Sequence, residues 1–202
     1  MSKLPKPNSA STPKRLDHEQ VLAAAEALVD KDGWRELTMT ALAAELGVKV
    51  PSLYNHVENL EALRGELQSR TLRAIGVKLN RRVMGRTGPE AFNAMIDSFR
   101  RFANEYPGRY DLAMQAPVDL DEFTAATADA GAALAAVVRS YGIDDTSLEL
   151  QLAAFAALHG VINLEHAGFF PPFIDTDRVF ERVLAIVLAL FEDAVPSEAQ
   201  AS

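Results

Sequence analysis

The sequence predicts an all-α protein in two parts: an N-terminal three-helix domain containing a helix-turn-helix, and a larger C-terminal helical domain. Apolar residues recur at the spacing of helix faces through most of the 202 residues. No segment alternates apolar and polar residues convincingly over the length of a β-strand. Gly, Pro and N-capping side chains stand between the periodic segments, where helices are expected to begin and end. About nine helices are expected, at residues 17–33, 38–47, 51–56, 59–83, 89–106, 107–114, 121–141, 144–167 and 175–193.

Start and stop signals define the first four helices. Gly33 ends the first, because glycine adopts the backbone conformations of a C-terminal cap. Thr38 is a suitable N-cap for the second helix, which Gly47 stops. Pro51 stands where proline is favoured in the first turn of the third helix, and Asn59 caps a longer fourth one. The apolar positions of the first and fourth helices are Val21, Leu22, Ala25, Leu28, Val29, Leu60, Leu63, Leu67, Leu72 and Ile75.

Gly and Pro separate the remaining helices. Residues 85–88 form a break before a helix rich in aromatic residues, and Pro107 ends that helix and begins a short segment. An Ala-rich helix follows at residues 121–141. The Gly-Phe-Phe-Pro-Pro stretch at 168–172 is a second break, after which Asp175 caps the final helix. The predicted division is a disordered tail at 1–15, a helix-turn-helix domain at 16–60, a helical regulatory, ligand-binding and dimerisation domain at 61–195, and a disordered tail at 196–202.

Composition and charge exclude several classes of protein. The chain has no cysteine, so it cannot form a disulfide framework or a zinc site built on Cys, and this favours a reducing compartment. No apolar run is long enough to cross a bilayer, and the first fifteen residues lack the apolar core of a signal peptide. Residues 1–84 carry 13 Lys and Arg against 10 Asp and Glu, whereas the remainder carries 7 against 18. We therefore expect a cytoplasmic protein whose two parts have different tasks.

Residues 38–57 have the chemistry of a DNA-reading segment. Two short helices flank a turn at Gly47, as in a helix-turn-helix. Asn55 can pair with adenine, and Val50 or Pro51 can contact a thymine methyl group. Phosphate oxygens can accept hydrogen bonds from Thr38, Ser52, Tyr54 and His56. The alternative is that Tyr54 and His56 only pack the small domain.

Over residues 17–66 the chain resembles the DNA-binding domain of the tetracycline-repressor (TetR) family. The resemblance is carried by Leu37-Thr38, Leu42-Ala43, Leu46-Gly47-Val48, Leu53-Tyr54-Asn55-His56-Val57 and Leu63. It implies a homodimer, an all-helical C-terminal domain and release from operator DNA when a small ligand binds. The DNA-contact positions that it implies are Thr38, Thr40, Lys49, Val50, Pro51, Ser52, Tyr54, Asn55 and His56. The family often has a basic residue after the recognition helix, where this chain has Glu58 and Glu61; Lys14, Arg15 or Arg64 are candidates to compensate.

Aromatic and polar residues of the C-terminal part are candidates to surround a ligand cavity. They are Phe99, Phe102, Tyr106, Tyr110, Met114, Phe155, His159, Asn163 and His166. The alternative is that the aromatic rings fill the core and the polar groups bond within it. Leu158-His159-Gly160 and Tyr106-Pro107-Gly108-x-Tyr110 also resemble a TetR subgroup with a Trp-His-Gly motif, although Leu158 replaces the tryptophan.

The last two helices are predicted to form a dimer interface. The final helix carries an apolar stripe, and the helix before it is rich in small residues, so two copies of the pair can form a four-helix bundle. The alternative is that the stripe faces the rest of its own domain. The stripe comprises Val179, Val183, Ile186, Val187 and Leu190, and the small residues are Ala153, Ala154, Ala156 and Ala157.

Catalysis is not expected. The only candidate metal cluster is His159, Glu165 and His166, and its two histidines lie about 10 Å apart along an ideal helix, too far to share one ion. Neither a phosphate-binding glycine loop nor a nucleophile elbow occurs. The sequence therefore predicts no cofactor, no metal and no enzyme, but a ligand-responsive regulator, a repressor released from a palindromic operator by a small molecule. The alternatives are a transcriptional activator and a helical ligand-binding protein without specific DNA binding.

Overall fold

The computed structural model describes residues 16–141 and 148–193. Within these ranges it contains nine helices and no strand, which confirms the predicted fold class. The helices are α1 (His18–Asp32), α2 (Met39–Glu45), α3 (Val50–Leu53), α4 (Leu60–Val83), α5 (Gly88–Glu105), α6 (Pro107–Ala113), α7 (Leu120–Arg139), α8 (Leu148–His166) and α9 (Thr176–Asp193). The tails predicted at 1–15 and 196–202, the proposed contacts of Lys14 and Arg15, and the predicted helix start at 144 lie outside the described residues.

Three N-terminal helices begin at side-chain caps, of which Thr38 and Asn59 were predicted. The Asp17 carboxylate accepts a hydrogen bond from the Gln20 backbone N–H, and the Gln20 side chain accepts one from the Asp17 N–H, which completes a capping box at α1. The Thr38 hydroxyl accepts from Ala41 N–H at α2, and the Asn59 side chain accepts from Ala62 N–H at α4. Local side-chain chemistry therefore sets these boundaries.

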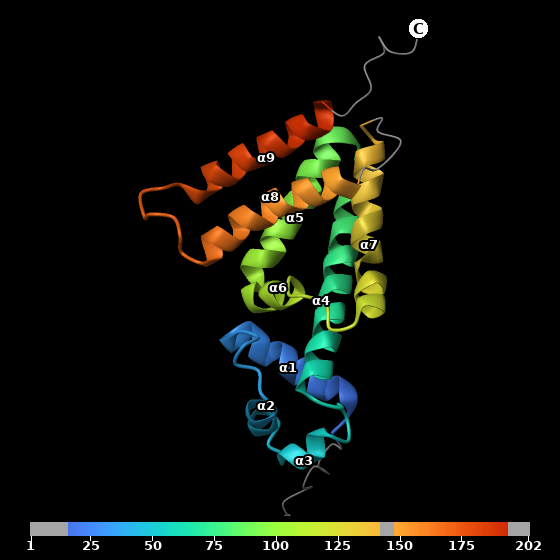
Figure 1. Ribbon diagram of the computed structural model, residues 1–202, viewed down its shortest axis with the longest axis vertical. Coiled ribbons are helices and arrows are strands. Elements are labelled where there is room, and N and C mark those ends of the chain that lie inside the picture. The colour runs from blue at the N-terminus through green and yellow to red at the C-terminus, as the bar shows by residue number, and fades with distance from the viewer. Residues whose placement is uncertain (1–15, 142–147, 194–202) are drawn as a thin grey trace, which may run out of the picture.

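The long helix α4 connects two hydrophobic cores (Figure 1). Its first half contributes Leu63 and Leu67 to the N-terminal core, which α1, α2 and α3 also form. Its second half contributes Leu72, Ile75 and Leu79 to the C-terminal core. One continuous helix therefore takes part in both cores. The domain boundary at residue 60/61 stays a prediction.

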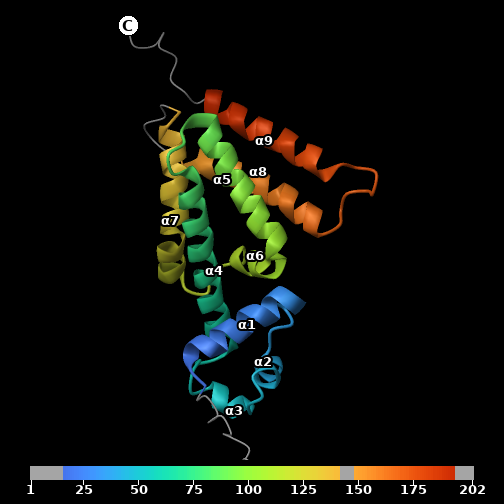
Figure 2. The ribbon, with the colours of Figure 1, turned by 180° about the vertical axis from the view of Figure 1, so that it is seen from behind.

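The C-terminal core lies among α4, α5, α7, α8 and α9. In Figures 1 and 2, α4 and α7 run side by side, and α8 and α9 form an adjacent pair that crosses this group. The loop between α8 and α9 projects from the side of the molecule. None of the helices in the described residues is long and apolar enough to span a membrane.

Helix α6 is the direct bridge between the two parts. It packs on α1, α4 and α5, and Leu112 belongs to the N-terminal core whereas Tyr110 belongs to the C-terminal one. Gly108 lies so close to the Val29 carbonyl that a Cβ atom at this position would collide with it. The absence of a side chain at Gly108 therefore lets α6 approach the end of α1.

Candidate functional site

The helix-turn-helix is held together by a small buried core. Leu42, Ala43 and Leu53 are at most 4 % exposed, and the Val48 N–H donates to the Ala43 carbonyl across the turn. Gly47 has a φ of 65°, a left-handed conformation that glycine adopts without steric cost. These contacts fix the angle between α2 and α3. The outer side of α3 has no comparable packing against the protein.

All nine predicted DNA-contact residues reach the surface. Six are exposed and three are half-buried, so the structure brings the predicted set onto one region around α3 and the start of α2. Tyr54 is 54 % exposed, which argues against the interpretation that its ring only packs the small domain. The exposed residues are Thr38, Thr40, Lys49, Pro51, Tyr54 and Asn55, and the half-buried ones are Val50, Ser52 and His56.

The residues after α3 do not supply a free cation. Glu58 and Glu61 are exposed. Arg64 turns inward: its guanidinium donates to the Leu37 carbonyl at 3.1 Å and lies 5.2 Å from the centre of the Trp34 ring. The Arg64 side chain therefore supports the loop before α2, and the hypothesis that it also compensates for the two glutamates by contacting phosphate stays a prediction.

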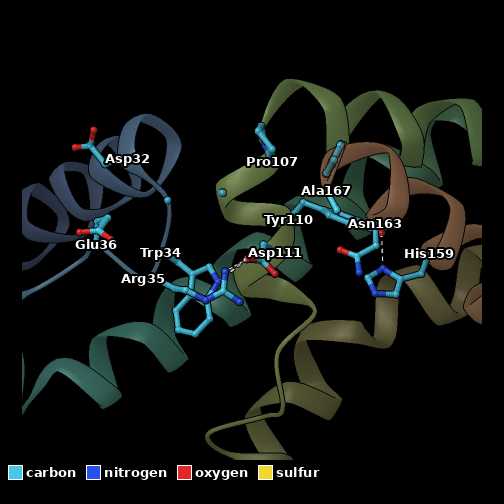
Figure 3. A pocket seen from close by; sticks show the side chains of 13 residues that line it. Asp32, Trp34, Arg35, Glu36, Pro107, Tyr110, Asp111, His159, Asn163 and Ala167 are labelled. Carbon is cyan, nitrogen blue, oxygen red and sulfur yellow. Dashed lines mark hydrogen bonds and ion pairs between the residues drawn. The ribbon is translucent and has the colours of Figure 1, made fainter. Parts of the chain in front are cut away.

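A cleft of about 500 Å³ opens where the N-terminal part meets the C-terminal part (Figure 3). One wall is the end of α1 and the loop that follows it, and the other consists of α6 and the last two turns of α8. We call it the interdomain cleft. Its lining residues are Asp32, Gly33, Trp34, Arg35, Glu36, Pro107, Gly108, Tyr110, Asp111, His159, Asn163, His166 and Ala167.

Two histidines of α8 in the interdomain cleft are held by hydrogen bonds. The Tyr110 hydroxyl lies 2.7 Å from Nδ1 of His159, and Nε2 of His166 lies 2.9 Å from Oδ1 of Asn104. Burial lowers the pKa of His159 and of His166 and raises the pKa of Tyr110. All three groups are therefore neutral near pH 7 and act as hydrogen-bonding groups, not as charges.

A second, apolar cavity of about 120 Å³ lies inside the C-terminal domain. It is lined by Ile75, Leu79, Met95, Ile96, Phe99, Ala130, Leu134 and Phe155. The aromatic residues between this cavity and the cleft contact one another: the Phe99 ring centre is 5.5 Å from that of Tyr110, and the Phe155 ring stacks on His159 at 5.7 Å.

The structure thus divides the nine predicted ligand residues into groups. Tyr110, His159, Asn163 and His166 line the interdomain cleft, and Phe99 and Phe155 line the apolar cavity. The other three line neither of these two. Phe102 and Tyr106 pack together with ring centres 5.3 Å apart, and Met114 packs half-buried against the C-terminal core.

Sequence reasoning missed the cleft wall formed by Trp34, Arg35 and Asp111. The Asp111 carboxylate accepts hydrogen bonds from the Trp34 indole N–H at 2.8 Å and from Arg35 at 3.0 Å. The only available signal was the single tryptophan of the chain, which directly follows the helix-ending Gly33. That position suggested an ordered loop, but it did not indicate the partner.

Further ion pairs join the two parts beside the cleft. Arg109 of α6 donates to Asp30 at 2.7 Å, and Arg70 of α4 pairs with Glu19 at 2.6 Å and Glu26 at 3.0 Å, all on α1. Because Glu26 is only 17 % exposed whereas Glu19 is 64 % exposed, the Arg70–Glu26 pair is screened less by solvent than the Arg70–Glu19 pair. Helix α1 is thus anchored to both α4 and α6.

The apolar stripe of α9, predicted as a dimer interface, is partly buried in the core of its own domain and partly exposed. Val187 is fully buried in the C-terminal core, and Val179 and Val183 pack half-buried against it, as the intramolecular alternative requires. Ile186 and Leu190 are 62 % and 41 % exposed. On α8, Ala154 is buried, whereas Ala153, Ala156 and Ala157 are exposed beside Leu152, which is 55 % exposed. Among the residues predicted for the interface, the apolar surface offered to a partner therefore consists of Ile186 and Leu190 on α9 and the exposed alanines of α8.

Known proteins match both parts of the chain. The family model described as "Bacterial regulatory proteins, tetR family" matches residues 21–67, and the one described as "Tetracyclin repressor-like, C-terminal domain" matches residues 92–187. A helix-turn-helix-type transcriptional regulator of Mycobacterium tuberculosis is 41 % identical over 175 residues, which cover 85 % of this chain and 80 % of the relative.

Solved structures share the fold at lower identity. Apo ActR from Streptomyces coelicolor superposes with a TM-score of 0.62 at 20 % identity, covering 96 % of this chain and all of the other. TetR from Acinetobacter baumannii superposes with a TM-score of 0.60 at 21 % identity, covering 91 % of this chain and all of the other. These two comparisons show that the fold is the same.

Proposed function

Because the chain belongs to the tetracycline-repressor (TetR) family of bacterial transcriptional regulators, we propose that it represses transcription from a palindromic operator and is released when a small molecule binds. Membership of the family confirms two predictions: the chain is a DNA-binding helix-turn-helix regulator, and it is not an enzyme. Repression, dimerisation, the effector, the site residues and a cytoplasmic location are parts of the proposal.

The observation that carries the proposal is the exposed region around α3. Asn55 is exposed and can pair with a base edge, and Lys49 and Tyr54, exposed at the two ends of α3, can contact phosphates. A dimer would place two such helices in successive major grooves, about 34–36 Å apart. The operator would then repeat the protein's two-fold symmetry.

The exposed apolar residues of α8 and α9 support dimerisation. Leu152, Ile186 and Leu190 would be covered in a four-helix bundle of two α8–α9 pairs, and burial of apolar area would stabilise it. The projecting loop between these helices also carries Phe169 and Phe173, which are 68 % and 84 % exposed. A second copy of the chain is the natural cover for such a surface.

Effector binding would act through the residues that separate the two cavities. Tyr110 contacts Phe99 on one side and His159 on the other, and its neighbour Asp111 holds the loop before α2. We also place the C-terminal domain in the Trp-His-Gly subgroup, with Leu158, which is 3 % exposed, filling the core at the tryptophan position.

The test is binding of the purified chain to the DNA that flanks its own coding region, with random DNA as competitor and with salt varied. We expect retention on one flanking fragment and a steep loss of affinity with salt, because Lys and Arg contacts release counterions. Weak binding to every sequence would instead favour the alternative, a helical ligand-binding protein in which Glu58 and Glu61 prevent specific recognition. Reporter transcription with and without the chain separates repression from activation.

A further inference from the structure

The interdomain cleft differs from the apolar cavity in position and in chemistry. The apolar cavity lies wholly within the C-terminal domain, whereas the cleft has one wall from the N-terminal part and one from α6 and α8. Its volume of about 500 Å³ falls in the range of small-molecule sites. An occupant of the cleft would touch both parts of the molecule at once.

The charges that line the cleft are predominantly negative. Asp32, Glu36 and Asp111 are acidic, Arg35 is the single arginine or lysine among the lining residues, and the two histidines are neutral. Arg35 pairs with Asp111, so these two charges offset each other. The C-terminal ends of α1 and α8 also line the cleft, and the negative ends of the two helix dipoles add to this potential.

Two carboxylates remain to meet a ligand. In the described part of the chain, no hydrogen bond or ion pair engages the Glu36 carboxylate, and Asp32 has only an exposed Lys31 at 3.8 Å. On the opposite wall, the Asn163 side chain is exposed without a partner among the described residues. The Tyr110 hydroxyl occupies Nδ1 of His159, which leaves Nε2 of that ring for a ligand. Figure 3 shows Asp32 and Glu36 on one side of the cleft and Asn163 and His159 on the other.

We propose that the interdomain cleft binds a small organic cation, with an amidinium, guanidinium or primary ammonium group held by Asp32 and Glu36 and a polar remainder bonded to Asn163 and His159. Charge-assisted hydrogen bonds to carboxylates favour such groups over neutral ones. The regulatory role of this ligand rests on the proposed function. Because the loop after α1 leads into α2, a ligand that holds this loop against α8 would change the position of the DNA-reading helices.

Trp34 makes the proposal directly measurable. It is the only tryptophan of the chain and lines the cleft, so its fluorescence responds to a ligand bound there. Trp34 also lines a neighbouring pocket with Glu61 and Arg64, so variants of the cleft carboxylates assign the response to the cleft. The probes are benzamidine, benzamide and benzoate, which have similar shapes and carry charges of about +1, 0 and −1 at pH 7.5. We expect saturable binding of benzamidine at low salt, about tenfold tighter than benzamide and weakened by added salt. Benzoate is expected to bind least.

Variants of the two carboxylates test the placement. Glu36→Gln and Asp32→Asn should each weaken benzamidine binding about three- to tenfold, and each should also reduce the preference for benzamidine over benzamide. Glu45→Gln, an exposed acid of α2 outside the cleft, is the matched control and should leave the affinity unchanged. Circular dichroism spectra of all three variants verify that they are folded.

Three results would overturn the proposal: no saturable response to benzamidine, binding of benzoate as tight as that of benzamidine, or equal affinities for Glu36→Gln, Asp32→Asn and Glu45→Gln. The DNA-binding test keeps this inference separate from the proposed function. Sequence-specific DNA binding without benzamidine binding removes only the cleft site. Benzamidine binding without specific DNA binding supports the site and removes the regulatory function.

Discussion

The Asp111 carboxylate of α6 accepts a hydrogen bond of 2.8 Å from the Trp34 indole N–H, which lies 77 residues earlier in the chain. Arg35 pairs with the same carboxylate, so two consecutive residues of the loop before α2 are fixed to the regulatory domain. The adjacent residue of α6, Tyr110, is hydrogen-bonded to His159 of α8. A displacement of α8 thus has a short route, through two neighbouring residues of α6, to the start of the helix-turn-helix.

Replacing Asp111 by alanine should loosen this connection. Asp111→Ala leaves the half-buried Trp34 N–H without its acceptor and removes the Arg35 ion pair. We expect a loss of about 1 kcal/mol in the free energy of unfolding, limited by solvent exposure of the pair, together with a red shift of Trp34 emission. Urea unfolding and fluorescence measure the two effects. Glu181→Ala, an exposed site inside α9, should show neither, and an unshifted Asp111→Ala emission would contradict the role of the bond.

Gly108→Ala should disturb the contact between α6 and α1. The added methyl group meets the Val29 carbonyl, a backbone atom that can move only with α1. Overpacking of this kind typically costs about 1–3 kcal/mol. The matched control is Gly131→Ala in α7, where a Cβ atom has open space; this change should stabilise the protein by up to about 1 kcal/mol. Urea denaturation of both variants checks the opposite signs, and equal effects would refute the steric account.

Asn55 and Lys49 should have separable roles on DNA. Asn55→Ala should cost about 1–3 kcal/mol on the operator and little on random DNA, because it removes a base contact. Lys49→Ala should weaken both DNAs alike and reduce the salt slope by about one, because it removes a phosphate contact. Fluorescence anisotropy over a range of salt concentrations gives both quantities. Equal losses on operator and random DNA for Asn55→Ala would make Asn55 a backbone contact.

The His18–Glu66 contact should make the stability of the protein depend on pH. Nε2 of His18 lies 2.6 Å from Glu66, and this hydrogen bond raises the pKa of His18 above its usual value near 6.5. The stabilisation from a raised pKa is complete below 6.5 and is lost as the pH rises through the folded-state value. The stability difference between the natural chain and His18→Gln should therefore shrink between pH 6 and pH 8.5.

His166 should make the stability depend on pH in the opposite direction. Burial lowers its pKa, so the folded state binds its proton less readily than the unfolded state does. The natural chain should therefore lose stability relative to His166→Gln as the pH falls below 6.5. Unfolding curves of the two variants at several pH values measure both trends. The same trend in both variants would contradict the assignment of the shifts.

Ile186→Glu should prevent dimerisation. Ile186 is 62 % exposed on α9, and a carboxylate there would be brought against its symmetry mate or an apolar neighbour in a bundle. We expect a monomer in sedimentation and a large loss of operator affinity. Val77→Glu, at a 43 % exposed position of α4, is the control and should remain dimeric. A dimeric Ile186→Glu protein would place the interface elsewhere.

Much of the fold was predictable because its signals are local. The caps at Asp17, Thr38 and Asn59 form the side-chain hydrogen bonds that their residue types favour. The exposed positions around α3 follow from helical periodicity and a short buried core. The ligand residues were predicted as one set, whereas the structure divides them between the cleft, the apolar cavity and neither. The sequence could not show this division, because periodicity indicates which face of a helix is apolar but not which helix packs against that face.

The sequence by itself determined the helices over the described residues, because capping and periodicity act within a few residues. It also indicated the family, through the resemblance carried by residues 37–57. Only the tertiary structure decided that Trp34 and Arg35 meet Asp111, that Arg64 turns inward, and that a polar cleft lies between the domains. These relationships depend on how closely α6 approaches α1, and that approach is set by packing at Gly108 between residues distant in the chain.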